Sequence, residues 1–222
     1  MALIVYGASL SPFVRKVRVL LAEKGLDYKI EYVNPFSQPP EFSDISPLKR
    51  IPVLRDTDRP EPNTLPDSSV ICDYVNHKWP TPALYPAEPF ERAQALWFEE
   101  YADSLVAQSI GLGLFFERVV KKLIGGECDE TVVTGTIRDK LPPIFDYLNK
   151  MIGARRFLVG GEFSIADIAV ASMFVNYDHA GETIDSKCWP NLSRYVAEMH
   201  TRPSFGTCVD GERRFLERQR AA

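Results

Sequence analysis

The chain opens with a short apolar run followed by an amphipathic stretch. Residues 3–6 (LIVY) are apolar and rich in β-branched side chains, which predicts a buried strand. A helix is then expected to begin at Pro12, because proline is favoured at the first helical position, and to end before Gly25. Its apolar side chains recur at helical spacing. The opposite face of this helix carries three cations, which are Arg15, Lys16 and Arg18.

Polar and apolar residues alternate over residues 28–33 (YKIEYV), and this pattern predicts a second strand. Since a helix separates the two strands, a right-handed parallel βαβ unit is the simplest topology. Residues 34–49 are rich in Pro, Ser and Asp, so we expect a surface loop or a short irregular helix there.

A proline interrupts the next apolar run, residues 50–54 (RIPVL). Because proline donates no hydrogen bond to a sheet, Pro52 must begin a strand, lie at a sheet edge or mark a special turn such as a cis peptide bond. The residues alone do not choose among these. Asp67–Ser68 then precede apolar positions at helical spacing, which predicts a helix that runs to about Trp79.

A proline-rich segment, residues 80–89, is the predicted linker between two domains. Before it, strands and helices alternate, and after it the strand pattern disappears. We therefore predict an α/β domain over residues 1–79 and an all-helical domain over residues 90–222.

The second domain shows helical spacing throughout. Two long amphipathic stretches cover about 90–123 and 130–152. Ser164 and Asp167 stand at the first and fourth positions of a capping box before an apolar run. Two further helices are expected near the C-terminus, at 191–200 and 204–218.

Composition and charge exclude several classes of protein. The chain has 222 residues, 45% hydrophobic and 25% charged, which is typical of a globular protein. Its net charge of -4 gives no support for a nucleic-acid partner, which requires a basic face. No apolar run reaches the roughly 20 residues of a membrane-spanning helix, and the first residues lack the cationic start of a secretory signal. We expect a cytoplasmic protein that binds a small molecule or another protein.

The cysteines and histidines receive no predicted role. The cysteines are scattered, with no CxxC and no His–Cys pairing at metal spacing, so neither a zinc site nor a dithiol site is predicted. Each histidine stands alone in a segment of helical pattern. These residues are Cys72, Cys128, Cys188, Cys208, His77, His179 and His200.

Ser11 is the first candidate for chemistry, because it places a hydroxyl at the start of the first predicted helix. Backbone N–H groups and the helix dipole favour anions there, and the hydroxyl can donate one more hydrogen bond. Lowering a thiol pKa by about two units requires about 2.7 kcal/mol. A charge-assisted hydrogen bond supplies roughly 1.5 to 3 kcal/mol, and a helix N-terminus about 0.3 to 1. We therefore predict that Ser11 stabilises a thiolate as a donor, since no motif places a base that would make it a nucleophile.

A serine before a proline is also a common helix cap, and alone Ser11 would need no other explanation. It is accompanied, however, by Pro52 and by Asp67–Ser68 at a second helix start. Their order and separation suit a tripeptide site on a thioredoxin-like domain.

Four segments, in order, resemble the cytosolic glutathione transferase family, and the resemblance covers nearly the whole chain. The first of them contains SPF, which is most similar to the serine-type classes, such as the plant tau class and related bacterial enzymes. The segments are YGASLSPFVRKVRVLLAEKG (6–25), KRIPVL (49–54), DSSVICDYV (67–75) and FSIADIAVA (163–171). The resemblance implies a thioredoxin-like α/β domain that binds glutathione, followed by an all-α domain that contributes the electrophile pocket.

The resemblance also implies roles for single residues. Ser11 matches the serine that donates to the glutathione sulfur, and Phe13 lies beside it. Pro52 matches a cis-proline, and Ile51 matches the residue whose backbone pairs with the cysteinyl part of glutathione.

Three more positions complete the implied glutathione site. Asp67 and Ser68 match an acidic-serine pair that binds the ammonium and carboxylate of the γ-glutamyl end. Either Lys49 or Arg50 reaches a glutathione carboxylate. The family more often has Glu where Asp67 stands, and residues 56–66 are longer and richer in proline than its usual hairpin, which leaves the local strand assignment open.

The implied electrophile pocket includes four aromatic residues, although aromatic residues at helical spacing are more often core residues. They are Phe13, Tyr101, Phe115 and Phe116.

The resemblance implies an enzyme of detoxification that adds the thiolate of reduced glutathione, its co-substrate, to hydrophobic electrophiles. A homodimer is expected, with no metal, no permanently bound cofactor and neither nucleic acid nor membrane as partner. Peroxide reduction, isomerisation and reductive dehalogenation at the same site are alternatives, as is a non-catalytic scaffold protein. Thiol–disulfide exchange is disfavoured, because Ser11 cannot form a mixed disulfide.

Overall fold

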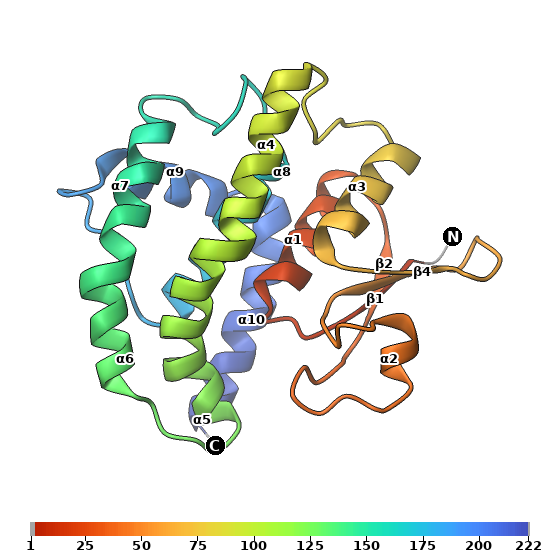
Figure 1. The fold of residues 1–222 in the computed structure, drawn as a ribbon, viewed down its shortest axis with the longest axis horizontal. Helices are drawn as coiled ribbons and strands as arrows, with labels where there is room; N and C mark the ends of the chain where they lie inside the picture. Colours follow the sequence, from red (N-terminus) through yellow and green to blue (C-terminus); the bar gives the residue numbers. More distant parts are fainter. Residues whose placement is uncertain (1–2, 222) are drawn as a thin grey trace. The chain divides into compact units, whose positions relative to one another are not determined.

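The computed structural model describes residues 3–221, and the chain divides into two compact units between Tyr85 and Pro86 (Figure 1). The first unit is a mixed α/β domain and the second is built of helices, which confirms the predicted fold class. The domain bounds predicted above, with a linker over 80–89, stay a prediction.

The first unit contains a four-stranded sheet in the order β2-β1-β3-β4. Its strands are β1 (Leu3–Tyr6), β2 (Tyr28–Glu31), β3 (Val53–Asp56) and β4 (Thr64–Pro66). Its helices are α1 (Pro12–Glu23), α2 (Phe42–Ile45) and α3 (Ser68–Lys78). The pairing of β1 with β2 is parallel, which confirms the predicted βαβ unit.

The register of the strands brings three chain segments to the same end of the sheet. Tyr6, the last residue of β1, pairs with Val53, the first residue of β3. Val53 pairs on its other side with Pro66, the last residue of β4, and both of these pairings are antiparallel. The segments that follow β1, precede β3 and follow β4 therefore leave the sheet at the same end.

Helix α1 packs closely on the turn that precedes it and on α3 (Figure 1). A Cβ at Gly7 would lie 2.5 Å from Val14 Cγ2, so only glycine fits where the chain leaves β1. The apolar face of α1, including Val14, Val17 and Leu20, is fully buried. These side chains hold the start of α1 against the end of the sheet.

The long connection between β3 and β4 is tied to α3 through Asp56. Both Tyr74 Oη and Lys78 Nζ donate to Asp56 Oδ2, and the Asp58 N–H donates to Oδ1. Burial opposes ionisation of Asp56, but the hydrogen bonds from Lys78 and Tyr74 hold its pKa below the ordinary value. These hydrogen bonds hold the start of the long hairpin, residues 56–66, against α3. The second strand of the hairpin is β4.

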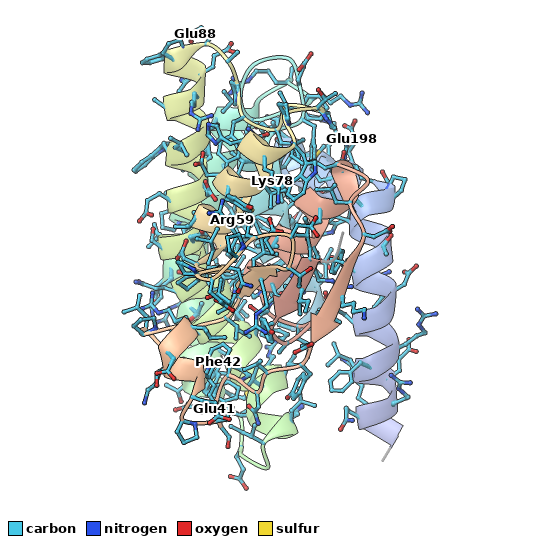
Figure 2. All side chains as sticks on the ribbon, turned by 90° about the vertical axis from the view of Figure 1, so that its right-hand side faces the viewer. Glu41, Phe42, Arg59, Lys78, Glu88 and Glu198 are labelled. Atoms are coloured by element: carbon cyan, nitrogen blue, oxygen red, sulfur yellow. The ribbon has the colours of Figure 1, made fainter. Side chains whose placement is uncertain are left out.

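The described part of the second unit contains helices and no strands. Glu88 caps the first of them, since its carboxylate accepts from the Phe90 and Glu91 N–H groups at 3.0 and 2.8 Å (Figure 2). Helices η1 and η2 are wider, π-type continuations of the helices before them. The helices are α4 (Pro89–Tyr101), η1 (Ala102–Val120), α5 (Lys121–Leu123), α6 (Glu130–Gly135), η2 (Thr136–Lys140), α7 (Leu141–Ile152), α8 (Ile165–His179), α9 (Pro190–His200) and α10 (Pro203–Ala221).

Helix α8 is the core of the second unit, and every residue in it except Asp178 is buried. Its predicted N-cap at Ser164 is confirmed, and the Ser164 N–H donates to Asp167 Oδ2 at 3.0 Å. Asp167 Oδ1 accepts from the Leu158 N–H and from Tyr195 Oη, both at 2.9 Å. Burial raises the pKa of Asp167 to about 6, although these hydrogen bonds favour the ionised form.

Over residues 3–221, the helices are all too short or too polar to cross a lipid bilayer.

Candidate functional site

The segments predicted to bind glutathione leave the sheet at the same end of its strands. Ser11 follows β1, Pro52 precedes β3 and Asp67 follows β4. Because β1, β3 and β4 are neighbours in register, these three segments leave the sheet side by side. The Ile51–Pro52 peptide bond is cis, one of the three possibilities that the sequence left open.

Ser11 is the N-cap of α1. Its backbone is extended, with φ -71° and ψ 126°, and its Oγ accepts from the Val14 N–H at 3.4 Å. A hydroxyl that accepts from a backbone amide keeps its own hydrogen available for donation. The side chain is partly exposed, so a ligand can reach it. This arrangement is suited to an anionic acceptor, because the positive end of α1 lies directly behind the hydroxyl.

Asp67 is the N-cap of α3 and has a backbone φ of 78°, in the left-handed region that non-glycine residues rarely adopt. Its Oδ1 accepts from the Ser69 N–H at 2.9 Å and from the Val70 N–H at 3.3 Å. Ser68 is the first residue of α3 and is buried. Asp67 itself is exposed, and a carboxylate can accept further hydrogen bonds, for example from an ammonium group.

A hollow of about 280 Å³ lies on the loop around α2, lined in part by Phe36, Gln38 and Lys49. Gln38 Nε2 donates to the Lys49 carbonyl at 3.0 Å, which ties the loop before β3 to the loop before α2. The Arg50 backbone is held by Ser46, whose Oγ accepts from the Arg50 N–H at 3.1 Å and donates to its carbonyl at 2.8 Å. Of the two candidate cations, Lys49 is the one that lines the hollow.

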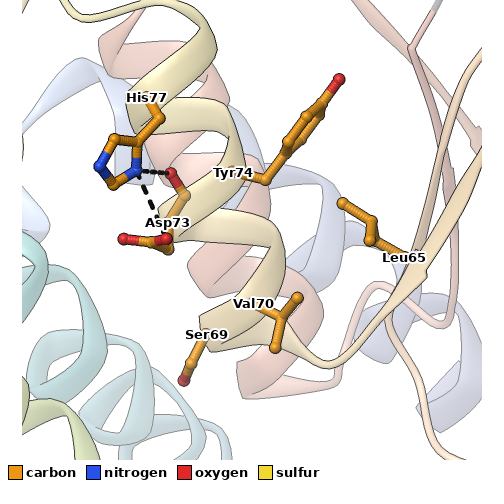
Figure 3. Close-up of a pocket in the computed structure, with 6 residues that line it drawn as sticks. All are labelled: Leu65, Ser69, Val70, Asp73, Tyr74 and His77. Carbon is orange, nitrogen blue, oxygen red and sulfur yellow. Dashed lines mark hydrogen bonds and ion pairs between the residues drawn. The ribbon is translucent and has the colours of Figure 1, made fainter. Parts of the chain in front are cut away.

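A second hollow, of about 570 Å³, lies along the outer face of α3 (Figure 3). It is open and mainly apolar, with Val70 49% exposed. His77 at its end contacts Asp73, with Nδ1 2.9 Å from the Asp73 carbonyl and 3.4 Å from Oδ2. Its lining residues are Leu65, Ser69, Val70, Asp73, Tyr74 and His77.

The aromatic residues predicted to line an electrophile pocket lie in different surroundings. Phe13 is partly exposed on the first turn of α1. In the second unit, Tyr101 lies with its ring centroid 4.9 Å from that of Tyr147 in α7. Phe115 is buried, and its ring centroid lies 6.5 Å from that of His179 in α8, whereas Phe116 is partly exposed.

The spacing of apolar residues did not predict that two cations of α1 are buried. Arg15 and Lys16 belong to the face of α1 that the apolar pattern treats as polar, yet both are 0% exposed. Lys16 Nζ donates to Ser69 Oγ, 3.0 Å away at the start of α3. No local sequence signal identifies this contact, because it joins residues 53 positions apart.

In the part of the chain that the structure describes, no three His, Cys, Asp or Glu side chains lie close enough together to hold a metal ion. None of the four cysteines, all within the described part of the chain, forms a disulfide bond. Cys72 and Cys208 are buried, Cys128 is partly exposed and Cys188 is exposed.

Two family models match this chain. One describes the N-terminal domain of glutathione S-transferases and matches residues 10–78. The other describes their C-terminal domain and matches residues 93–198. Together they span most of both units, and the chain therefore belongs to the glutathione S-transferase family, whose members use glutathione as a substrate.

Individual relatives agree with this assignment and differ in what their names describe. Glutathione S-transferase 3 of Zea mays is 31% identical over 167 residues, which cover 73% of this chain and 72% of the relative. FtsZ-localized protein A of Caulobacter vibrioides is 25% identical over 196 residues, covering 88% and 86%. A crystal structure of a glutathione S-transferase from Rhodospirillum rubrum F11 superposes with a TM-score of 0.84 at 28% identity, covering 93% of this chain and 91% of that one.

Proposed function

We propose that this protein is a serine-type glutathione transferase that conjugates the thiolate of reduced glutathione to hydrophobic electrophiles. The observation that supports this most strongly is that the segments of Ser11, Pro52 and Asp67 leave the sheet at the same end of its strands. Glutathione carries a zwitterionic γ-glutamyl end, a thiol and a peptide backbone. The site offers a carboxylate at a helix start, a hydroxyl at a second helix start and an extended segment between them.

In the proposed mechanism, glutathione binds with its γ-glutamyl end at the start of α3. Asp67 accepts from the ammonium, while the Ser68 hydroxyl and the positive end of α3 bind the α-carboxylate. The backbone of Ile51, next to Pro52, pairs with the cysteinyl part. This places the thiol beside Ser11, at the start of α1.

The thiol then loses its proton to solvent, and the Ser11 hydroxyl donates a hydrogen bond to the resulting thiolate. The thiolate attacks an electrophilic carbon, so that a C–S bond forms and the leaving group departs with its electron pair. Where there is no leaving group, the resulting carbanion takes up a proton. Proximity and a higher thiolate population supply the rate gain. No residue other than Ser11 has to act on the sulfur.

We assign the glycyl carboxylate of glutathione to Lys49 rather than to Arg50. Lys49 lines the hollow beside Gln38, whereas Arg50, whose backbone is bonded to Ser46, is not among the residues that line it. As residues that contact the electrophile we retain Phe13 in the first unit and, separately, Tyr101 and Phe116 in the second, since each keeps some exposed surface.

We also propose that the protein forms the homodimer expected above and acts in the cytoplasm in detoxification. The open apolar hollow along α3, with Val70 exposed, is a suitable part of a dimer interface. Sedimentation equilibrium of Val70→Asp tests this. A dimer that becomes a monomer supports the proposal, and an unchanged mass removes this face from the interface.

A scaffold protein is the second candidate function, because FtsZ-localized protein A is among the relatives and its name describes a location rather than a reaction. Calorimetric titration with glutathione, followed by an assay with a chlorodinitrobenzene electrophile, separates the candidates. Binding with turnover supports the transferase. Binding without turnover supports peroxidase, isomerase or dehalogenase chemistry at the same site. The absence of binding supports the scaffold protein.

A further inference from the structure

The second half of α10 carries a group of exposed arginines. The first half anchors the helix to the second unit, since Phe205 and Val209 are buried there. His179 Nε2 in α8 lies 3.0 Å from Glu212 Oε2, and both side chains are buried. Of residues 213–220, only Leu216 is buried. The exposed arginines of this segment, called the arginine face of α10 below, are Arg213, Arg214, Arg218 and Arg220.

The helix geometry places these side chains in two short rows. At about 100° per residue, Arg214 and Arg218 lie about 40° apart and on the side opposite the buried Leu216. Arg213 and Arg220 form the second row, and the whole face is about 10 Å long. Residues 213–220 contain four arginines and one acid, so their net charge is +3, and the chain's -4 leaves -7 for all other residues. The arginine face is therefore a positive surface on an acidic protein.

The arginine face differs from other exposed arginines of the second unit, because its cations are not paired. Within residues 3–221, none of its four side chains makes a hydrogen bond or an ion pair. By contrast, Arg138 Nη2 lies 2.7 Å from a carboxylate oxygen of Asp139. Likewise, Arg156 Nε lies 2.5 Å from a carboxylate oxygen of Glu198. Four cations with no anion bound to them leave their hydrogen-bond donors to solvent or to a partner.

Helix stability alone does not account for this arrangement. Like charges one turn apart, such as Arg214 and Arg218, destabilise a helix. The helix dipole favours cations, but its effect falls off within the last turn. That turn contains Arg218 and Arg220, so the dipole leaves Arg213 and Arg214 unexplained.

We propose that the arginine face of α10 binds a short acidic segment of another protein. Each guanidinium group can donate two parallel hydrogen bonds to one carboxylate, which makes arginine the suitable residue for a run of Asp and Glu side chains. A protein partner of this kind leaves the proposed glutathione site unoccupied, so the inference goes beyond the transferase reaction and does not depend on it.

A protein segment fits this face better than a membrane or a nucleic acid does. A helix that binds a lipid surface inserts an apolar face, but here Leu216 is buried and Phe215 is only 37% exposed. A nucleic acid is a long polyanion, so it would extend past the arginine face and meet the acidic remainder of the chain. A short acidic segment meets mainly the arginines, because exposed charges beyond about 10 Å are screened at about 0.1 M salt.

The test is a fluorescence anisotropy titration of a labelled octaglutamate peptide with the full-length protein at about 0.1 M salt. In the double variant Arg214→Gln/Arg218→Gln, we expect the dissociation constant to rise about tenfold, which corresponds to about 1.4 kcal/mol. Arg214→Lys/Arg218→Lys keeps both charges but loses the parallel hydrogen bonds, so its affinity should lie between those of wild type and the glutamine variant.

Arg138→Gln/Arg155→Gln is the matched control. It removes the same charge from two exposed arginines of the same unit, and each of them has its own partner, Asp139 for Arg138 and the Met151 carbonyl for Arg155. This control should bind the peptide as wild type does. Because all four substituted arginines are exposed, each variant should unfold at the wild-type temperature.

A loss of affinity in Arg214→Gln/Arg218→Gln that the control does not share supports the inference. An equal loss in both overturns it, because the peptide then responds only to net charge, and wild-type protein that does not bind the peptide overturns it as well. A single-stranded DNA oligonucleotide, or vesicles of equal parts phosphatidylserine and phosphatidylcholine, that bind the arginine face more tightly than the peptide would identify another class of partner and overturn it too.

Discussion

Ser11 accepts a hydrogen bond from the backbone N–H of Val14, with 3.4 Å between Oγ and the nitrogen. A hydroxyl has two acceptor positions and one hydrogen, so capping the helix leaves the hydrogen free for a thiolate. Accepting a bond from the amide also polarises the O–H group and strengthens it as a donor. The two roles of Ser11, in helix stability and in chemistry, are therefore compatible.

Asp67→Asn should weaken glutathione binding without unfolding the start of α3. Asparagine is as good an N-cap as aspartate, so its side-chain oxygen can still accept from the N–H groups of Ser69 and Val70. It lacks the negative charge that we assign to the γ-glutamyl ammonium, and removing one partner of a charge-assisted hydrogen bond costs roughly 1.5 to 3 kcal/mol. We expect the dissociation constant to rise at least about tenfold.

Asp67→Ala is the companion variant, because it removes both the charge and the cap. Calorimetric titration and urea unfolding of the two variants separate the contributions. Glutathione affinity that is unaltered in Asp67→Asn would take this residue out of the site.

The buried Asp167 should make the free energy of unfolding depend on pH. Its folded pKa of about 6 lies above the ordinary aspartate value of 3.8, so the folded protein holds this proton more tightly than the unfolded chain. The resulting stabilisation is complete below the unfolded pKa and is lost as the pH rises through the folded pKa. Between about pH 4 and pH 7, the difference in unfolding free energy between wild type and Asp167→Asn should fall by about 2 kcal/mol.

Asp56→Asn is the control for this measurement, because the pKa of Asp56 is shifted in the other direction. A carboxylate with a lowered folded pKa stabilises the protein above its unfolded pKa and loses that effect as the pH falls. The corresponding difference for Asp56→Asn should therefore rise with pH. Urea unfolding at several pH values reports both, and differences of the same sign would show that burial does not dominate at Asp167.

Lys24→Met should destabilise the first unit and spare the glutathione site. Its ammonium donates to the carbonyls of Trp79 and Pro82, and removing a charged hydrogen-bond donor costs roughly 1.5 to 3 kcal/mol. Chemical unfolding should show this loss, while the dissociation constant for glutathione stays at the wild-type value. A change in affinity as large as that in Asp67→Asn would mean that the two ends of α3 are not independent.

Local signals explain why much of this fold was predictable. The apolar run at residues 3–6, the proline at the start of α1 and the capping residues Asp67 and Ser164 each act on neighbours a few positions away. Pro52 lies immediately before β3. The sequence limited it to a strand start, a sheet edge or a special turn such as a cis peptide bond, and the Ile51–Pro52 bond is cis.

Features that depend on distant contacts escaped prediction. Lys16 lies on the face of α1 that periodicity assigns to solvent, and only its contact with Ser69 shows why it is buried. Tyr195 binds Asp167 across 28 positions, and the capping pattern around Ser164 gave no sign of this third partner. The positive φ of Asp67 likewise had no signal in the sequence, since non-glycine residues rarely adopt it.

The ultraviolet difference spectrum of glutathione titrated into the protein, followed across pH, tests the central claim most directly. We predict a thiolate band whose apparent pKa lies about two units below that of free glutathione. In Ser11→Ala this pKa should rise by at least about one unit, or about 1.4 kcal/mol, while glutathione still binds. An identical thiol titration in wild type and Ser11→Ala, with glutathione bound to both, would contradict the role of Ser11 as the thiolate donor.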